Sequence, residues 1–308
     1  MNRVLDKFAT DIGAHGAVVC VGGNTQPTEG GLQDQGARIV RAPAGIVSYE
    51  PSEMTVTAYA GTPVTELANA LAAHGQTIAM PIADGSTIGG ALAVGRSSVL
   101  HLGHGNVRDT LLQARFVNGA GELVKVGGPT VKNVTGFDLC RLLVGSLGTF
   151  GFFGEVILRT RPIATSTQWF SALQADPFAT RRSLYRPASI MWDGATTWVC
   201  LEGHPEDVAA QATILGGQFQ PCSDPPASLG GPEKHRWAME PKELRSFGAE
   251  RTPGSFMALI GIGEVWCSQA PPATPTEPRV QQLEQSIKTK MDPACRLNPG
   301  RKPGRRST

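Results

Sequence analysis

The sequence predicts an α+β protein built from two modules, and three observations support this prediction. Residues 46–76 change from an alternating apolar pattern to a helical one, residues 111–128 hold two strand-like runs around a turn, and glycine and tryptophan are unevenly distributed. Strands mixed with hairpins, instead of alternating strictly with helices, are typical of α+β folds. We therefore expect an α+β domain and not a doubly wound parallel sheet.

Residues 46–76 predict a strand, a tight turn and a helix. The run "MTVTAYA" is rich in β-branched residues and alternates in polarity, which favours a strand. Thr62 is then expected to cap a helix, with Pro63 in the first turn and Gly75 as the stop. The expected apolar face of this helix consists of Val64, Leu67, Ala68 and Leu71.

The next elements are a hairpin, a short helix and a strand. The stretch "LLQARFVNGAGELVKVGG" reads as two strands joined by the turn "NGAG". After it, "GFDLCRLLVGS" predicts a short helix, and "FFGEVILRTRP" predicts a strand that Pro162 ends.

Composition separates the two modules. Of 37 glycines, 25 lie in residues 1–161, whereas all five tryptophans and 14 of the 23 prolines lie between 162 and 290. Glycine lets backbone approach another group closely. We therefore expect the first module to bind a ligand through its backbone, and the second to be a packed, loop-rich unit with aromatic anchors.

Charge and cysteine content exclude several classes of protein. The 308 residues are 41% hydrophobic with a net charge of +2, and basic residues cluster only in the tail "RKPGRRST", which predicts no nucleic-acid surface. The sequence shows neither a signal peptide nor a membrane span, so a soluble, cytoplasmic protein is expected. Its six cysteines are widely spaced, which predicts reduced thiols and no metal site.

Four glycine-bearing segments are the candidate binding elements. Neither the dinucleotide pattern G-x-G-x-x-G nor a Walker loop occurs. Exposed amides in glycine-rich turns form concave nests that suit a diphosphate, and four such segments in one module favour binding over ordinary turns. The segments are "VGGNTQ", "ADGSTIGGALA", "GHGNVRDT" and "KNVTGFDLCRLLVGSLGTFG".

The order of these motifs, ending with "MDPACRLNPGR", resembles the FAD-binding domain of the vanillyl-alcohol oxidase and p-cresol methylhydroxylase (PCMH) type. Within that family it is most similar to the FAD-binding subunits of glycolate oxidase. The resemblance implies a two-lobed PCMH-type α+β domain over residues 1–162, completed by 291–301. It also implies a shortened second α+β cap domain over 163–290. The basic tail over 302–308 is expected to be disordered.

The resemblance also implies which residues bind FAD. The pyrophosphate loop is Gly22, Gly23, Asn24, Thr25 and Gln26. A second phosphate and ribityl contact is implied for Asp84, Gly85, Ser86, Thr87, Gly89 and Gly90. Contacts near the flavin ring and ribityl chain are implied for Asn106, Arg108, Asp109, Lys132, Gly136 and Asp138. The adenine strand is implied to contain Glu155 and Val156, and the returning segment Asn298.

Two departures from the family affect the expected chemistry. The histidine-rich segment that binds the 2-hydroxy acid in related dehydrogenase subunits has no counterpart, since His204 and His235 are isolated among charged residues. The loop "VGGNTQ" has no histidine or cysteine that might hold flavin covalently, and Cys20 precedes it, so noncovalent FAD is expected. The catalytic residue is unknown, with His104 a candidate by motif order.

Three functions remain open. The first is a redox subunit that takes part in oxidising a small 2-hydroxy acid such as glycolate, in a complex with a second flavoprotein and an iron-sulfur subunit. The second is a non-catalytic, flavin-binding partner of a separate catalytic flavoprotein. The third is the FAD-bearing medium subunit of a molybdenum hydroxylase, against which the "NPGR" motif argues.

Overall fold

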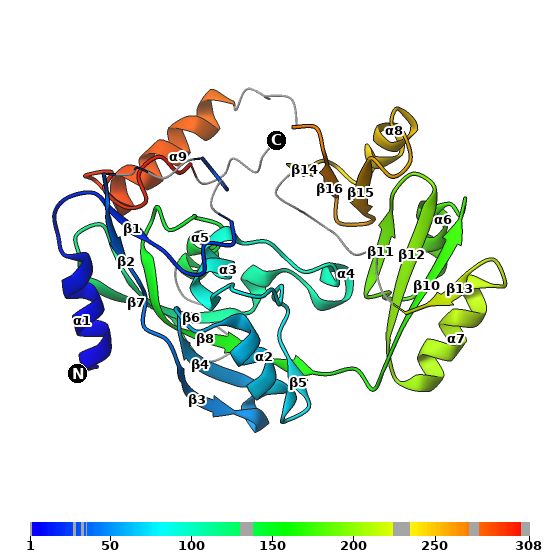
Figure 1. Cartoon of the computed structure of the whole chain (residues 1–308), viewed down its shortest axis with the longest axis horizontal. Helices are drawn as coiled ribbons and strands as arrows, with labels where there is room; N and C mark the ends of the chain where they lie inside the picture. Colours follow the sequence, from blue (N-terminus) through cyan, green and yellow to red (C-terminus); the bar gives the residue numbers. More distant parts are fainter. Residues whose placement is uncertain are drawn as a thin grey trace. The chain divides into compact units, whose positions relative to one another are not determined.

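The computed structural model describes residues 2–26, 29–31, 34, 36–129, 138–223, 235–270 and 277–302. These residues divide into two compact units (Figure 1). Unit 1 comprises Met1–Ser98, Asn106–Ile163 and Pro275–Arg305, and unit 2 comprises Val99–Gly105 and Ala164–Thr274. Both units mix helices with antiparallel sheets, which confirms the predicted α+β class. The predicted boundaries at 162 and 291 stay predictions.

Unit 1 is built on a five-stranded antiparallel sheet of order β3-β4-β8-β6-β7. Its strands are β3 (Ile46–Glu50), β4 (Thr55–Tyr59), β6 (Leu111–Val117), β7 (Leu123–Gly127) and β8 (Phe152–Arg159). Two smaller sheets pair β1 (Val18–Cys20) with β2 (Arg38–Val40) in parallel and β5 (Gln76–Thr77) with β9 (Arg161–Pro162) in antiparallel fashion. The 3-10 turns are Pro51–Glu53 and Val107–Asp109.

Helices pack on both faces of the five-stranded sheet (Figure 1). One face carries α2 (Val64–Ala72), α3 (Ile88–Val94) and α5 (Leu139–Leu143), whose apolar side chains share a core with alternate residues of β4, β6 and β8. The opposite face carries α1 (Arg3–Ile12), and α9 (Pro278–Met291) contributes partly buried Ile287 and Met291 to the first core. Side chains alternate between the faces of a strand, so both faces of β8 are buried.

Most of the predicted elements of unit 1 are confirmed, but three details are wrong. Thr62 does not cap α2: its hydroxyl donates to the carbonyl of Tyr59 at 2.7 Å and accepts from the amide of Gly45 at 2.9 Å. Pro63 is the N-cap residue of α2 and not part of its first turn. Pro162 does not end β8, which stops at Arg159, because Pro162 belongs to the separate short strand β9.

Unit 2 is a seven-stranded antiparallel sheet of order β13-β10-β12-β11-β15-β16-β14. Its strands are β10 (Ser166–Leu173), β11 (Ser189–Trp192), β12 (Thr196–Gly203), β13 (Gln220–Cys222), β14 (His235–Ala238), β15 (Phe256–Leu259) and β16 (Glu264–Cys267). Its helices are α4 (His101–His104), α6 (Pro177–Ser183), α7 (Pro205–Leu215) and α8 (Leu244–Ala249).

Aromatic rings contact one another in and beside the core of unit 2. Trp192 meets Phe178 and Phe256 edge-on at centroid distances of 5.8 and 5.4 Å, and Trp237 meets Phe247 at 5.2 Å. Trp266 is buried in a smaller cluster with Met191 and Met257. Edge-to-face pairs add to the energy of simple burial. These tryptophans are therefore core residues, as expected of aromatic anchors.

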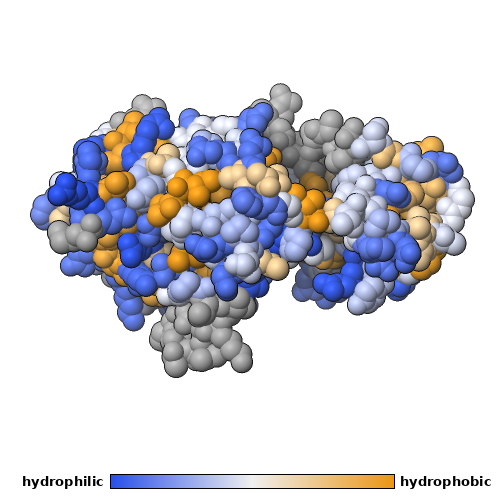
Figure 2. Space-filling model, turned by 90° about the horizontal axis from the view of Figure 1, so that it is seen from below, coloured by the Kyte–Doolittle hydropathy of each residue, from blue (hydrophilic) through white to orange (hydrophobic). Residues whose placement is uncertain are grey.

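Within the described part of the chain, no helix combines the length and apolar character needed to span a membrane. The face of the molecule in Figure 2 intersperses hydrophilic and hydrophobic side chains.

Candidate functional site

The loop Gly22–Gln26 leaves β1 and turns sharply. Asn24 has a φ of 55°, a left-handed conformation that asparagine tolerates better than most residues. The guanidinium of Arg41 donates from Nη1 to the carbonyl oxygen of Gly22 at 2.8 Å. This contact ties the Gly22 carbonyl to Arg41, the residue that follows β2 (Arg38–Val40), and restrains the loop.

Two glycines of this loop lie against the loop Ala83–Gly90. A Cβ added to Gly23 would stand 1.4 Å from the carbonyl oxygen of Gly85, and one added to Gly22 would stand 2.4 Å from Oγ1 of Thr87. Neither Gly22 nor Gly23 has a positive φ. Gly23 is thus required because the two loops touch backbone to backbone, whereas Gly22 makes room for the side chain of Thr87.

The loop Ala83–Gly90 is in turn tied to the start of α2. The amide of Val64 donates to the carbonyl of Ser86 at 3.0 Å, and the amide of Gly89 donates to the carbonyl of Ala60 at 2.7 Å. The Thr87 hydroxyl accepts from the amide of Gly90 at 3.2 Å and caps α3. The Ser86 carbonyl thus accepts the amide of Val64 at the start of α2, which the Thr62 side chain does not bond.

Asn298 joins three segments of unit 1. Its Oδ1 accepts from the amide of Cys20 at 3.0 Å, its Nδ2 donates to the carbonyl of Leu147 at 2.6 Å, and its own amide donates to Val18 at 2.9 Å. The same side chain fills the space beside Gly148, where a Cβ would stand 2.6 Å from Nδ2. Asn298 therefore fastens the returning segment to both β1 and the turn after α5.

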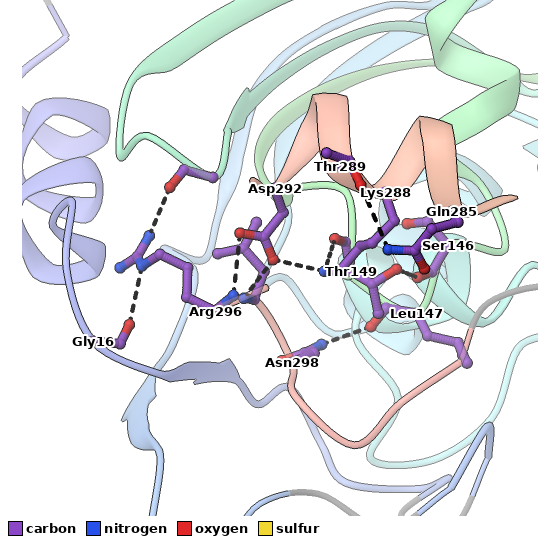
Figure 3. A network of polar contacts seen from close by, with 12 residues as sticks. Gly16, Ser146, Leu147, Thr149, Gln285, Lys288, Thr289, Asp292, Arg296 and Asn298 are labelled. Atoms are coloured by element: carbon purple, nitrogen blue, oxygen red, sulfur yellow. Dashed lines mark hydrogen bonds and ion pairs between the residues drawn. The ribbon is translucent and has the colours of Figure 1, made fainter. Parts of the chain in front are cut away.

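A buried polar network anchors the returning segment (Figure 3). The fully buried carboxylate of Asp292 accepts from Lys288 Nζ at 2.6 Å and from the amides of Arg296 and Leu297 at 3.1 and 2.8 Å. The guanidinium of Arg296 donates to the carbonyls of Gly16 and Ile12, and burial lowers its pKa below the usual arginine value. Buried charges that are paired and fully hydrogen-bonded hold a single geometry.

Two adjoining pockets of unit 1 open around these loops, and we call them together the glycine cleft. The first encloses about 860 Å³, counted to its open mouth, and the second about 700 Å³. Both are lined by Cys20, Val21, Gly22, Gly23, Thr87, Gly90, Ala93 and Asn298. The first adds, among others, Asn24, Thr25, Gln26, Ser86, Arg96, Leu147 and Arg301. The second adds, among others, Arg41, Ala60, Gly61, Gly89, Gly148, Gly151 and Phe152.

The charge of the glycine cleft is of one sign. Among the described residues that line it, the charged side chains are Arg41, Arg96 and Arg301, and no carboxylate is among them. Such a lining attracts an anionic ligand, and guanidinium groups suit phosphate oxygens in particular. Small residues supply most of the remaining lining, so a ligand can lie directly against the backbone.

The Cys20 thiol faces the cleft in its neutral form. Burial raises its pKa to about 12, against smaller opposing effects of the Ala42 amide and of Arg41. A thiol that stays protonated is a poor nucleophile. This property supports the expectation of noncovalent cofactor.

The predicted site residues fall into three groups in the structure. Most of the residues predicted in the pyrophosphate loop, the second glycine loop and the returning segment line the cleft together. Asp84 and Gly85 lie in the same loop without lining it. Lys132 and Gly136 lie outside the described residues.

The other predicted residues lie elsewhere in unit 1, and their FAD contacts stay predictions. Asn106 accepts from the amide of Arg108, and Asp109 and Asp138 form ion pairs with Arg141 at 2.7 and 3.2 Å. Glu155 and Val156 are buried in β8; Glu155 faces Arg115, and Val156 is in the core.

His104 belongs to unit 2. Its Nε2 lies 2.6 Å from a carboxylate oxygen of Glu202 on β12, with both side chains largely buried. Its neighbour Gly103 packs on Ala188, where a Cβ would stand 2.7 Å from the Ala188 Cα. His104 is thus held within unit 2, and its predicted place near the flavin stays a prediction.

Sequence reasoning missed three residues that line the cleft with charge: Arg41, Arg96 and Arg301. Arg301 stands in the "NPGR" motif and Arg96 directly follows Gly95, the C-cap of α3. The available signal was an arginine close to a glycine-rich turn of the kind that suits phosphate. Whether such an arginine lines the cleft depends on which distant segments of the chain come together. The spacing of residues in the sequence does not show this.

An α+β unit with a glycine-lined, positively charged cleft between touching loops suits a nucleotide cofactor. Residues 8–127 match the family described as FAD binding domain, which supports FAD as the cofactor. The family resemblance seen in the motifs is thereby confirmed.

Curated relatives extend this match. The chain is 34% identical over 189 residues to glycolate oxidase subunit GlcE of Escherichia coli, covering 58% of this chain and 54% of that protein. It is 32% identical over 149 residues to a D-2-hydroxyglutarate dehydrogenase of Xanthomonas citri pv. viticola, covering 46% and 31%. It is 31% identical over 145 residues to glycolate oxidase subunit GlcD of Bacillus subtilis, covering 46% and 29%. The matched part spans about half of the first relative and about a third of the others.

Among solved structures, alkyldihydroxyacetonephosphate synthase superposes with a TM-score of 0.66 over 92% of this chain and 71% of that one, at 15% sequence identity. At this identity the likeness shows the fold alone.

Proposed function

We propose that this chain is the FAD-carrying subunit of an oxidoreductase that takes part in oxidising a small 2-hydroxy acid such as glycolate. The single observation that carries the proposal is the glycine cleft, built by the FAD binding domain and charged by arginines alone among its described lining residues. The relatives named for glycolate oxidase and for a 2-hydroxy-acid dehydrogenase support the substrate class.

FAD bound in such a cleft supplies a two-electron acceptor, while the protein supplies orientation and electrostatics. The residues of this chain that would hold it fit the group. Loops at Gly22–Gln26 and Ala83–Gly90 present backbone without bulky side chains, and the three arginines balance the charge of a diphosphate. Asn298 keeps the two sides of the cleft in register through its contacts with Cys20 and Leu147.

The proposal includes a complex. Two of the relatives carry the word subunit in their names, which supports an assembly. We propose that in it this chain works beside a second flavoprotein and an iron-sulfur subunit, in the cytoplasm. We also propose that residues 163–290 form the cap domain of the family, with a role in contacts to substrate or to another subunit.

A second candidate function is a flavin-binding subunit without catalysis of its own. The observation that favours it concerns three histidines of unit 2: His204 and His235 are exposed, and Nε2 of His104 is engaged by Glu202. While that contact is kept, Nε2 of His104 is not available to accept a substrate proton.

Visible spectroscopy separates the two functions. The purified protein should show the flavin band, and acid precipitation should release the yellow colour into the supernatant because the FAD is noncovalent. Anaerobic addition of glycolate or D-lactate should bleach the band if the chain catalyses alone. A band that stays oxidised alone but bleaches when the partner subunits are added supports the complex. A band that stays oxidised in the reconstituted complex, while the partner's flavin is reduced, supports the non-catalytic role.

A further inference from the structure

Arg96, Glu29 and Arg301 form a charged group at the first pocket of the glycine cleft. Arg96 Nη2 lies 3.1 Å from Glu29 Oε2, with 18% and 17% of the two side chains exposed. The guanidinium of Arg301 donates from Nη1 to the backbone carbonyl of Glu29 at 2.6 Å. Both arginines line the pocket, whereas Glu29 does not.

The backbone holds both arginines in place. Gly95, directly before Arg96, adopts a φ of 68° and lies so close to Gly145 that a Cβ would stand 2.8 Å from the Gly145 amide. On the other side, the amide of Lys302 donates to the carbonyl of Gly30 at 2.9 Å, which lays residues 300–302 along residues 29–31. Neither guanidinium therefore hangs from a flexible loop.

The positive charges of this group line the pocket, whereas its negative charge does not. The Glu29 carboxylate pairs with Arg96, the backbone carbonyl of Glu29 accepts from Arg301, and Glu29 is not among the described residues that line the pocket. Burial lowers the pKa of Arg301, with Glu29 acting in the opposite direction. An anion that enters the pocket therefore meets guanidinium groups at its wall, and partial burial strengthens the attraction between opposite charges.

We propose that Arg96 and Arg301 bind the diphosphate of FAD as a guanidinium pair, with Glu29 positioning both. The loops of the cleft supply backbone amides, which alone leave most of the two negative charges of a diphosphate unbalanced. The guanidinium pair supplies that balance with planar donors that suit phosphate oxygens. This inference rests on FAD as the ligand of the glycine cleft.

The test titrates FAD into flavin-free full-length protein and follows the quenching of flavin fluorescence. Arg96→Gln and Arg301→Gln are each expected to weaken FAD binding at least tenfold, with Arg96→Lys and Arg301→Lys restoring part of the loss. The matched control is Arg159→Gln, an exposed arginine of β8 outside both pockets, which should bind FAD as the wild type does.

Salt separates a charge contact from a merely structural one. Raising sodium chloride screens an ionic contact, so the wild-type dissociation constant for FAD should rise with salt and that of either glutamine variant should rise less. Competition by ADP, which keeps the diphosphate, should weaken in the variants more than competition by adenosine. Equal loss for ADP and adenosine with an unchanged salt slope would mean that the arginines only hold the fold, and would overturn the proposal.

Remaining outcomes are also decisive. If Arg301→Gln does not fold, Arg301→Lys and the Arg96 pair of variants decide alone. If both glutamine variants bind FAD with wild-type affinity, the two arginines do not bind the diphosphate. FAD would then still be the ligand of the cleft. Failure of the wild type to bind FAD overturns the pair together with the proposed function.

Discussion

One glycine of each unit makes room for a different kind of neighbour. In unit 1, Gly23 makes room for the backbone of another loop, since its Cβ would stand 1.4 Å from the Gly85 carbonyl. In unit 2, Gly248 makes room for an aromatic ring, since its Cβ would stand 2.2 Å from the indole of Trp192. At Gly23 the close approach of backbone shapes the wall of the glycine cleft, whereas at Gly248 the close approach of a ring fills the core. The atom beside a glycine is therefore more informative than the glycine itself.

The largest expected effect breaks the contact between the loops of unit 1. Gly23→Val should abolish FAD binding, because a β-branched side chain cannot rotate away from main-chain atoms and the loops must separate. The ratio of flavin absorbance to protein absorbance measures this loss. The matched control is Gly128→Val, since a Cβ there meets nothing within 4 Å.

All five tryptophans lie in unit 2, so their fluorescence reports that unit alone. Gly23→Val should leave this signal and its unfolding transition unchanged. Flavin at wild-type occupancy in Gly23→Val would contradict the backbone contact, and a collapsed tryptophan signal would contradict the independence of the two units.

The second prediction changes the core of unit 2 and leaves the loops of unit 1 intact. Phe256 is buried and contacts both Trp192 and Phe247 edge-on. Phe256→Ala should destabilise unit 2 by about 3–5 kcal/mol through lost burial and a cavity. Denaturant unfolding followed by tryptophan fluorescence measures the change, while flavin occupancy should stay near that of the wild type. Parallel loss of both signals would show that the units fold as one.

The third effect is smaller and tests how the cleft is held. Asn298→Ala removes the partners of the Cys20 amide and the Leu147 carbonyl, and should destabilise unit 1 by about 2 kcal/mol because buried polar groups lose their bonds. Unfolding followed by circular dichroism and by flavin release measures it. Asn118→Ala is the control, since Asn118 accepts two amide bonds in an exposed hairpin turn away from the cleft. Equal losses would show that Asn298 is an ordinary turn residue.

The smallest effect concerns one thiol. With a pKa of about 12, Cys20 holds about one thiolate in ten thousand at pH 8, so iodoacetamide should modify it far more slowly than exposed Cys295. The Cys20 rate should rise about tenfold per pH unit toward pH 11, because a raised pKa delays ionisation. Mass spectrometry of peptides measures both rates. Comparable rates at pH 8 would contradict the burial of the Cys20 thiol.

The sequence predicted correctly those elements that are stabilised by contacts between residues close together in the chain. The hairpin at "NGAG" formed as expected because the side chain of Asn118 bonds the amides of Ala120 and Glu122 within the same turn. The cap of α2 was wrong for a related reason. Thr62 has the right side chain, but Gly45 and Tyr59 engage its hydroxyl, and Ser86 from a distant loop meets the helix instead.

The candidate site shows the same division. Glycine loops could be found from their spacing and order, because each carries its own conformational signal. Arg96 and Arg301 are 205 residues apart in number, and only the folded chain brings both to Glu29. Charge in a cleft is a property of long-range contacts, and a single sequence does not reveal which of many arginines contribute.

The position of Asn298 has a consequence for how the protein is made. The segment 296–298 runs beside β1 and bridges Val18 to Leu297, so the cleft joins residues near 20 to residues near 298. During translation, the ribosome must finish all of unit 2 before this segment emerges. The cleft is therefore complete only after unit 2 has been made, and a premature stop codon anywhere before codon 298 should yield colourless protein even when unit 2 is complete.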